Sequence, residues 1–262
     1  MPRVLLLGGL DPSGGAGLTV DATVVALHHG EPLPLALTFT DQGLAGFRRQ
    51  HAVSAEQWGM ALRTVLADGP LHAVKVGLVP DAATVRTVAR ELGTFAAGVP
   101  VVVDPVLSAT SGGLLGCDDL AAAYLEHLVP KATVFTPNVP ELAAVCGGDP
   151  ARALRAGAGA VLVKGGHAEG ATCDDVLHRG ADRIVFRRER LPVGRVRGTG
   201  CTLAAAIAAR LAHGASLGDA CRFAGDWLAQ LLRVLGPAER ADTPPRLLPF
   251  ARVPPAVARE QA

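Results

Sequence analysis

Short apolar runs rich in β-branched residues alternate along the chain with stretches in which apolar residues recur every three or four positions. The first pattern predicts buried strands, and the second predicts helices that pack by one face. Strands are expected at residues 4–7, 33–40, 73–76, 99–103, 132–135 and 160–163. Helices are expected at residues 18–28, from a Ser54 cap to residue 67, after Asp81, and at residues 216–235. This alternation indicates an α/β protein whose central, mostly parallel sheet is covered by helices.

Two further segments lie outside this alternation. Residues 174–178 and 183–187 flank a turn at 179–182, which predicts an antiparallel hairpin at the edge of the sheet. Residues 242–262 contain prolines and arginines with little periodicity, so we expect a poorly structured tail. No linker or internal repeat divides the preceding part, and residues 1–241 are therefore predicted to form a single domain.

Polar side chains follow several of the predicted strands at the point where each strand ends. Asp104 follows the fourth strand, Thr136 and Asn138 follow the fifth, and Lys164 follows the sixth. Because ligands of open α/β sheets bind beyond the carboxyl ends of the strands, we expect these residues and Glu141 to share one cleft. A carboxylate in such a cleft can hold Mg²⁺. Each residue alone has an ordinary alternative, namely a turn, a helix cap or a solvated lysine.

The segment formed by Gly198, Thr199, Gly200 and Cys201 leads directly into an apolar helical stripe. The unpaired N–H groups of a helix start bind anions, and glycines let an anion approach the backbone closely. A cysteine at such a position is expected to have a lowered pKa, because the helix start favours its thiolate. The alternative is an ordinary glycine turn before a core helix that contains one buried cysteine.

The first strand is followed by a loop at residues 8–17 that contains five glycines. The loop lacks the Lys-Ser/Thr ending of a P-loop, and its glycine spacing differs from that of a dinucleotide-binding motif, which disfavours a Rossmann oxidoreductase. A loop of ten residues is long for a plain connection, so a ligand-binding role is favoured over a flexible turn. Asp21, in the helix that follows, either accepts hydrogen bonds from a ligand or compensates the helix dipole.

Together these segments predict phosphoryl transfer. In this hypothesis the N–H groups of residues 198–201 hold the moving phosphoryl group, Mg²⁺ neutralises the nucleotide, and Cys201 accepts the proton of the substrate hydroxyl. Phosphoryl transfer passes through a loose transition state, so positioning and charge matter more than a strong base. Arg197 adds positive charge beside the anion site, and Arg195 is a second candidate for that role.

Composition narrows the classes of partner and compartment. The chain has 25 basic and 24 acidic residues and a net charge of +1, so no general attraction to nucleic acid or to an anionic membrane is expected. Its longest apolar runs are far shorter than the roughly 18 residues that span a bilayer. The five cysteines form no Cys-x-x-Cys pair and fit no common zinc spacing, which predicts free thiols in the cytoplasm.

The order and spacing of these motifs resemble the hydroxymethylpyrimidine/phosphomethylpyrimidine kinase family of thiamine biosynthesis over about residues 3 to 235. The matching segments are Gly9-x-Asp-Pro-Ser-Gly-Gly-Ala-Gly17 with Asp21, Gln42, Lys75-Val-Gly77, Asp104-Pro-Val106, Ala109-Thr-Ser-Gly112, Thr136-Pro-Asn-x-x-Glu141, Lys164-Gly-Gly-His167 and Gly198-Thr-Gly-Cys201. The resemblance implies a ribokinase-like fold with three α/β/α layers, ATP and Mg²⁺ as co-substrates, and a homodimer. It implies phosphorylation of 4-amino-5-hydroxymethyl-2-methylpyrimidine, and then of its monophosphate to the diphosphate.

The resemblance also assigns expected roles to individual residues. The pyrimidine site would comprise Gln42, Asp21, Gly9, Ala16, Leu78 and Val106. The nucleotide, phosphate and metal positions would comprise Lys164, Thr136, Asn138, Arg197, Asp104 and Glu141. The anion hole and its catalytic cysteine would comprise Gly198, Thr199, Gly200 and Cys201.

Two alternatives remain open at this point. A pyridoxal or pyridoxine kinase of the cysteine-bearing type would use the same hydroxymethyl chemistry on a larger ring. A degenerate protein could bind the pyrimidine for regulation without turning it over. The family commonly has Asn-Thr after Gln42 and Asn-Thr-His before the anion hole, whereas this chain has Gly43-Leu44 and Arg195-Val196-Arg197 at those positions.

Overall fold

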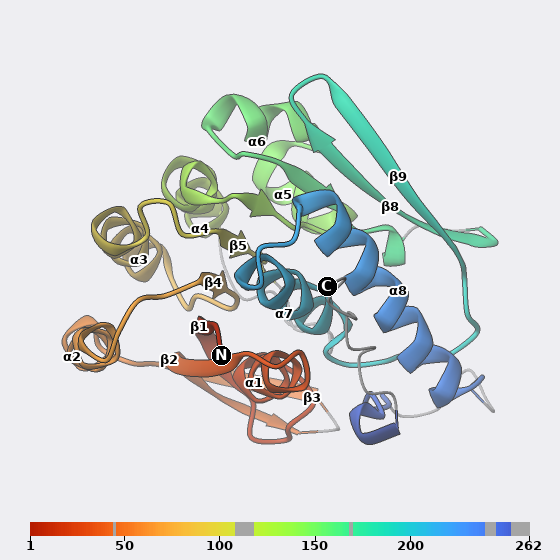
Figure 1. The fold of residues 1–262 in the computed structure, drawn as a ribbon, viewed down its shortest axis with the longest axis horizontal. Coiled ribbons are helices and arrows are strands. Elements are labelled where there is room, and N and C mark those ends of the chain that lie inside the picture. The colour runs from red at the N-terminus through yellow and green to blue at the C-terminus, as the bar shows by residue number, and fades with distance from the viewer. Residues whose placement is uncertain (44–45, 108–117, 168–169, 239–244, 253–262) are drawn as a thin grey trace, which may run out of the picture.

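A computed structural model describes residues 1–43, 46–107, 118–167, 170–238 and 245–252 of the chain. Its described strands form one sheet in the order β3-β2-β1-β4-β5-β6-β7-β8-β9, flanked by helices on both faces (Figure 1). The strands are β1 (Arg3–Leu10), β2 (Glu31–Gly43), β3 (Gly46–Ala52), β4 (Ala73–Val76), β5 (Val101–Val103), β6 (Val134–Phe135), β7 (Val161–Val163), β8 (Thr172–Arg179) and β9 (Asp182–Glu189). The central strands from β2 to β7 run parallel, while β3, β8 and β9 pair antiparallel at the two edges.

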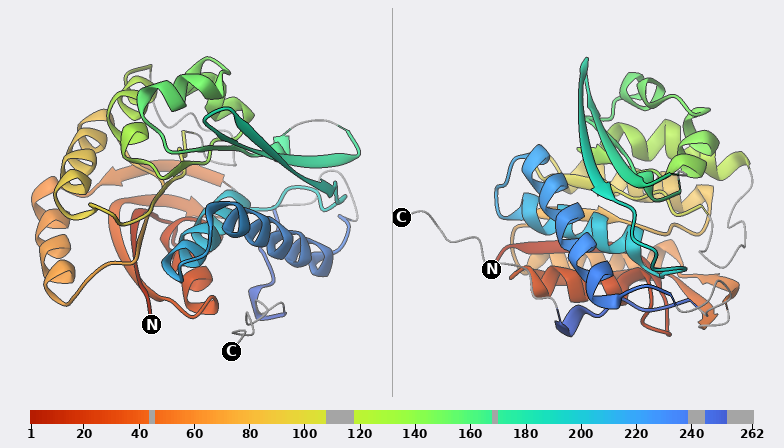
Figure 2. Two further views of the ribbon diagram at one scale, coloured as in Figure 1. Left: turned by 45° about the horizontal axis from the view of Figure 1, so that its top comes forward. Right: turned by 90° about the vertical axis from the view of Figure 1, so that its right-hand side faces the viewer.

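The two faces of the sheet are covered by different sets of helices. One face packs against α1 (Gly17–Leu27), α7 (Thr199–Ala212) and α8 (Leu217–Leu235). The other packs against α2 (Ala55–Ala67), α3 (Ala82–Phe95), α4 (Asp118–Ala123), α5 (Val139–Cys146) and α6 (Pro150–Ala156). The two views of Figure 2 show the resulting three layers. The predicted three-layer α/β/α architecture is confirmed.

Side-chain alternation along β1 explains how one strand supports both layers. Val4 and Leu6 belong to the core shared with α1, α7 and α8, whereas Leu5 and Leu7 belong to the core on the opposite face. All four side chains are almost completely buried. A strand that is buried on both faces has no polar side, which is why the central strands appear in the sequence as continuous apolar runs.

The predicted strands and helices are present, with boundaries that shift by a few residues. The hairpin of β8 and β9 is also present, and Figure 1 shows it projecting at one edge of the sheet. The hydrophobic pattern did not predict β3, α4 or α6. Strand β3 contains Arg48, Arg49, Gln50 and His51, which are exposed or half-buried at the edge and break the apolar alternation. The seven-residue helix α6 is too short to show a period.

Part of the predicted tail packs against the folded body. Residues 245–252 are described, and they form a parallel bridge between Arg246 and Val196 and a stacked contact between Phe250 and Trp227. Leu248 is buried there. This segment therefore departs from the expected loose tail, because pairing with residues 195–197 satisfies backbone groups that periodicity cannot reveal. The rest of residues 242–262 lies outside the described ranges.

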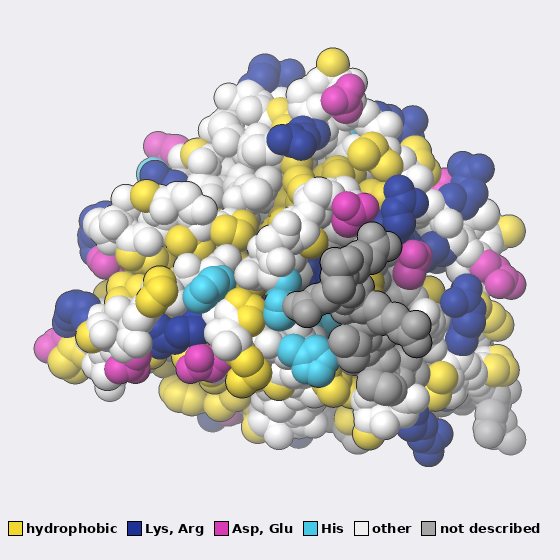
Figure 3. Space-filling view, viewed as in Figure 1, with side chains coloured by type: hydrophobic (Ala, Val, Ile, Leu, Met, Phe, Trp, Pro, Cys, Tyr) yellow, Lys and Arg dark blue, Asp and Glu magenta, His cyan; other side chains and the backbone are white. Residues whose placement is uncertain are grey.

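Surface composition agrees with the near-neutral charge. Figure 3 shows basic and acidic side chains interspersed over the face in view. Within the described ranges, no helix combines the length and the apolar character that a membrane span requires.

One buried histidine makes the fold sensitive to acid. His28 lies edge-on against Phe223 and Trp227, and its buried Nε2 has no hydrogen-bond partner among the described residues. Burial, with help from the Arg210 charge, lowers the pKa of His28 from 6.5 to about 4. The folded state therefore binds fewer protons than the unfolded state between these two values. Stability from neutral His28 is complete above pH 6.5 and is lost as the pH falls toward 4.

We predict that His28→Phe flattens this acid dependence. In the wild type, the free energy of unfolding should fall by about 3 kcal/mol between pH 6.5 and 4 through this one group. Denaturant melts at a series of pH values measure the slope, with the exposed His51→Gln as a control that should keep it. An unchanged slope in His28→Phe would contradict the assignment.

Candidate active site

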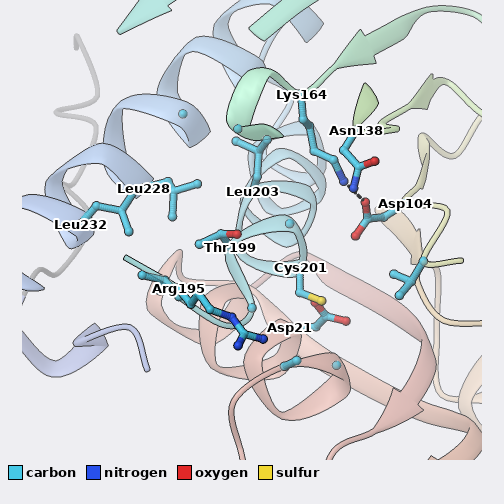
Figure 4. Close-up of a pocket in the computed structure, with 18 of the residues that line it drawn as sticks. Asp21, Asp104, Asn138, Lys164, Arg195, Thr199, Cys201, Leu203, Leu228 and Leu232 are labelled. Carbon is cyan, nitrogen blue, oxygen red and sulfur yellow. Dashed lines mark hydrogen bonds and ion pairs between the residues drawn. The ribbon is translucent and has the colours of Figure 1, made fainter. Parts of the chain in front are cut away.

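A cavity of about 460 Å³ lies beyond the carboxyl ends of the central strands. Figure 4 shows side chains converging on it from the sheet, from the start of α7 and from α8. Apart from Thr136 and Arg197, every site residue predicted from the sequence lines this cavity. Residues from seven separate parts of the chain therefore meet at one place beyond the strand ends.

The start of α7 forms one wall of the cavity. Gly198 is the N-cap of α7 with φ of 74°, and no side chain caps the helix there. A Cβ atom at Gly198 would lie 2.5 Å from the Gly15 carbonyl oxygen, so only glycine permits this approach of the two loops. The first N–H groups of α7 are left for a ligand, and the helix dipole makes the site suitable for an anion.

Lys164 links two carboxylates on the opposite wall. Its Nζ lies 2.6 Å from Asp104 Oδ1 and 3.6 Å from Glu141 Oε2. Burial opposes ionisation of Asp104, but the ammonium groups of Lys164 and Lys75 outweigh it and hold the pKa of Asp104 below its usual value. Burial raises the pKa of Glu141, and the attraction of Lys164 offsets this only in part.

The capping alternative for Asn138 and Glu141 is correct, and it does not exclude the site. Asn138 Oδ1 accepts from the Glu141 N–H at 2.8 Å, and Glu141 Oε2 accepts from the Asn138 N–H at 2.7 Å. This capping box opens α5 and fixes the Glu141 carboxylate beside Lys164. The same hydrogen bonds that start the helix therefore position a site carboxylate.

The anion site and the charged wall are in contact through Gly200. A Cβ atom at Gly200 would lie 3.4 Å from Lys164 Nζ and 3.8 Å from Asp104 Oδ2. A glycine here keeps the space between the helix start and these charges open. An anion bound to the first turn of α7 would thus lie close to the Lys164 ammonium.

A second buried ion pair lies on the floor of the cavity. Asp21 Oδ2 accepts from Lys75 Nζ at 2.7 Å, and both side chains are about 1% exposed. Burial raises the pKa of Asp21 to about 6, although Lys75 lowers it. Burial disfavours charged Lys75, but Asp21, Cys201 and Asp104 outweigh this effect and raise its pKa. The pair is therefore ionised at neutral pH.

Asp21 has one oxygen left for a ligand. Its Oδ1 is buried and has no hydrogen-bond partner among the described residues. The first turn of α1 contains no acidic residue, so Asp21 does not compensate the helix dipole, and the ligand-binding alternative fits its position. The hydrophobic pattern did not identify Lys75 as a site residue, because a single lysine in an apolar run is also common at an ordinary strand end.

Cys201 lies beside Asp21 in the cavity (Figure 4). Burial raises the pKa of the Cys201 thiol to about 11, although Lys75 and the Gly17 N–H lower it. The expectation of a lowered pKa is therefore wrong. Burial, together with the carboxylates of Asp21 and Asp104, disfavours the thiolate more strongly than the Lys75 charge and the Gly17 N–H favour it.

One end of the cavity is suited to a small polar ring. The predicted residues Gln42, Gly9, Ala16, Leu78 and Val106 line this end. Thr40 and Phe47 line it as well, and neither was predicted from the sequence. Phe47 lies on β3, an edge strand that the hydrophobic pattern did not reveal.

The other end of the cavity is bounded by aliphatic side chains. Leu203 comes from α7, and Leu228 and Leu232 come from α8 one helical turn apart (Figure 4). Their spacing in the sequence is that of any amphipathic helix, so it did not mark them as site residues. This apolar wall lies beyond the anion site and suits a flat, weakly polar group such as a nucleotide base.

Two predicted phosphate-binding residues have other roles. Arg197 is buried and pairs with Asp11 Oδ2 at 2.6 Å, which removes its guanidinium from the cavity. Arg195 lines the cavity in its place (Figure 4). Thr136 is fully buried, and its hydroxyl donates to Asp104 Oδ1 at 3.2 Å, so it orients a carboxylate.

An open helix start lies over the strand ends of a parallel sheet, beside paired carboxylates and lysines, and this is the architecture of the ribokinase-like class. The family model described as phosphomethylpyrimidine kinase matches residues 11–243. The hydroxymethylpyrimidine/phosphomethylpyrimidine kinase of Rhizobium meliloti is 39% identical over 240 residues, covering 86% of this chain and 88% of that protein. The chain belongs to the phosphomethylpyrimidine kinase family.

Other similar proteins are either longer than this chain or are kinases of known structure. The thiamine biosynthesis multifunctional protein ThiED of Corynebacterium glutamicum is 37% identical over 88% of this chain, which spans only 32% of that protein. The phosphomethylpyrimidine kinase structure from Clostridium difficile has a TM-score of 0.76 at 25% identity, covering 88% of this chain and 99% of that one. An ADP complex of Bacillus subtilis pyridoxal kinase has a TM-score of 0.80 at 25% identity, covering 88% and 91%.

We predict slow alkylation of Cys201 by iodoacetamide. With a pKa of about 11, its thiolate fraction at pH 8 is smaller than that of a free cysteine by a factor of about 100. Peptide mass spectrometry over a pH series measures the rate at this site, with N-acetylcysteine as the reference thiol. The rate should still be rising at pH 10. A plateau below pH 9 would show a lowered pKa and contradict the burial argument.

Proposed function

We propose that this protein phosphorylates the hydroxymethyl group of 4-amino-5-hydroxymethyl-2-methylpyrimidine, and then the resulting monophosphate, with ATP as donor in thiamine biosynthesis. The observation that carries the proposal is the uncapped start of α7, which lies between the polar end and the apolar end of one cavity. A phosphoryl group held there can face an acceptor on one side and a nucleotide on the other. Membership of the phosphomethylpyrimidine kinase family supports the substrate class.

The acceptor end offers groups that match an aminopyrimidine. Gln42 has both a donor and an acceptor on one amide, and the free Oδ1 of Asp21 can accept from an amino or hydroxyl group. Phe47 and Leu78 provide apolar surface for the ring. The hydroxymethyl group would then point toward Cys201 and the start of α7.

The donor end is built for a nucleoside triphosphate. Leu203, Leu228 and Leu232 supply the apolar wall for the base, and the ADP complex of the related pyridoxal kinase supports a nucleotide in this fold. Lys164 and Arg195 supply positive charge along the phosphates. The N–H groups of Gly198 to Cys201 stabilise the charge that develops on the transferred group, which is the largest contribution expected of such a site.

Asp104 and Glu141 fit a magnesium ion of the phosphate-bridging kind. Among the described residues, no group of three His, Cys, Asp or Glu side chains forms a complete metal cage. Mg²⁺ in kinases is held by one or two carboxylates together with substrate phosphates, and these two carboxylates already attract the Lys164 ammonium. When bound, the ion would neutralise phosphate charge. Asp104 would hold it, Glu141 would assist, and Thr136 would keep Asp104 in place.

Cys201 is assigned the role of accepting the proton of the substrate hydroxyl. With substrates bound, the thiol first loses its own proton to solvent, and the charge of Lys75 beside it favours the resulting thiolate. The thiolate accepts a hydrogen bond from the substrate hydroxyl and takes its proton late in the loose transition state, as the oxygen loses basicity. Retention of Asp104, Glu141 and Cys201 supports an active enzyme over a degenerate binding protein.

We predict that Cys201→Ala lowers kcat by about 100-fold or more, because general-base and positioning effects are of that size. The KM for ATP should stay within about twofold, since the thiol is not placed against the nucleotide. Steady-state kinetics at pH 7 and 9 measure both constants. Unchanged kcat would remove Cys201 from the proton-transfer step.

The substrate assay separates the two kinase alternatives. Purified protein is incubated with ATP, Mg²⁺ and either the pyrimidine alcohol, its monophosphate or pyridoxal, and the phosphorylated products are resolved by chromatography. We expect phosphorylation of the alcohol and of its monophosphate. Phosphorylation of pyridoxal alone would overturn the proposal and favour the pyridoxal kinase alternative, whose fold is shared.

The proposal also includes an oligomeric state and a cellular compartment. We expect a homodimer in the cytoplasm, on the resemblance and on the four free cysteines of the described residues. Light scattering of the purified protein gives the mass directly. A mass near 26.8 kDa would indicate a monomer.

A further inference from the structure

Arg197 stands directly before the anion site, but its side chain does not reach the cavity. Its Nη2 donates to Asp11 Oδ2 at 2.6 Å, and its Nη1 donates to the Gly43 carbonyl at 2.7 Å and to Ser13 Oγ at 3.2 Å. The Arg197 and Asp11 side chains are 4% and 3% exposed. A charge buried this deeply is costly unless it is paired, so these contacts are not incidental surface bonds.

The three partners of Arg197 belong to two different walls of the acceptor end. Asp11 and Ser13 belong to the first glycine loop, and Asp11 itself lines the cavity together with Ala16 and Gly17 of that loop. Gly43 is the last residue of β2 and follows Gln42, the residue expected to bind the pyrimidine. Asp11 Oδ1 accepts from the Ser13 N–H and hydroxyl, so its carboxylate also fixes the turn of the loop. One guanidinium therefore joins the loop, the end of β2 and the anion site.

The backbone of Arg197 is held as firmly as its side chain. Its N–H donates to the Arg246 carbonyl at 3.0 Å, and the Arg246 N–H donates to the Arg195 carbonyl at 2.9 Å. The Arg246 side chain donates to carbonyls at the end of α8, including that of Gly236 at 2.9 Å. The described segment 245–252 thus braces the strand-like residues before Gly198 against α8.

We propose that Arg197 is a positioning residue that sets the distance between the acceptor pocket and the anion site. This proposal rests on the proposed function for its kinetic consequence. The planar guanidinium presents donors in a fixed fork, so it can bond three oxygens of two segments at once, which a lysine ammonium on a flexible stem cannot do with the same geometry. Arg197 touches neither substrate. It keeps the first loop and Gln42 in register with the first turn of α7.

The kinetic test uses Arg197→Met and Arg197→Lys. We expect kcat to fall by about 10- to 100-fold in Arg197→Met, because misplacement by about 1 Å is enough for such a loss, and the KM for ATP to stay within about twofold. Arg197→Lys should recover part of kcat by keeping the Asp11 pair. A rise in the KM for ATP with kcat unchanged would show that Arg197 acts on the phosphates and overturn the proposal.

A double variant tests the pairing itself. Asp11→Asn leaves Arg197 buried without its counter-charge, whereas Asp11→Asn with Arg197→Met removes both charges. We expect the double variant to be no slower than the slower single variant, since the two residues act as one unit. Multiplied losses would show that Asp11 and Arg197 act independently. Arg187→Met, which breaks an exposed ion pair with Asp174 on the hairpin, is the matched control and should keep wild-type kcat.

Amide hydrogen exchange gives a readout that needs no turnover. In Arg197→Met, residues 11–17 and residues 40–43 should exchange faster than in the wild type and in Arg187→Met, while α3 on the opposite face should be unchanged. Equal exchange in both segments would overturn the positioning role. If the wild type phosphorylates none of the tested alcohols, the proposed function fails, but the exchange result still decides this inference. If Arg197→Met does not fold, Arg197→Lys is measured in the same way.

Discussion

The unpaired N–H groups at the start of α7 are the feature on which the site depends. They lie over the ends of the central strands because Gly198 allows the two glycine loops to meet and because Gly200 leaves room beside Lys164. Two buried groups of charged side chains line the same cavity. Asp21 and Lys75 form one pair, and Lys164 joins Asp104 and Glu141 on the facing wall. These charges and N–H donors are already in place, so the protein would need little reorganisation when a phosphoryl group is transferred.

The buried ion pairs give the site a defined shape. Each lysine occupies a position where its charge is balanced by carboxylates, so the apolar core around it is not left with an unpaired charge. The same balance affects the thiol, because carboxylates near Cys201 oppose a second negative charge. The cysteine is therefore a protonated thiol until a substrate alters its surroundings. Catalysis in this arrangement relies on placement and charge, with a base needed only late in the reaction.

The sequence predicted most of the parallel sheet and most of the site, since strand ends carry a polar signal that stands out against apolar runs. Asp104, Asn138 and Lys164 were found in this way. Long-range partners were not predictable. Neither the pairing of Arg197 with Asp11, 186 positions away, nor the burial of Cys201 leaves a local pattern in the chain. Strand β3 was missed because an edge strand tolerates exposed arginines, and Phe47 was missed with it.

The central claim is that one cavity holds the acceptor, the moving phosphoryl group and the nucleotide in line across the start of α7. A crystal structure of the protein with the pyrimidine alcohol and an unreactive ATP analogue tests it most directly. We expect the terminal phosphate on the N–H groups of Gly198 to Cys201, the hydroxymethyl group beside Cys201, and the ring amino group within reach of Gln42 or Asp21. A terminal phosphate bound away from the start of α7, or an acceptor ring outside the pocket of Gln42, would contradict it.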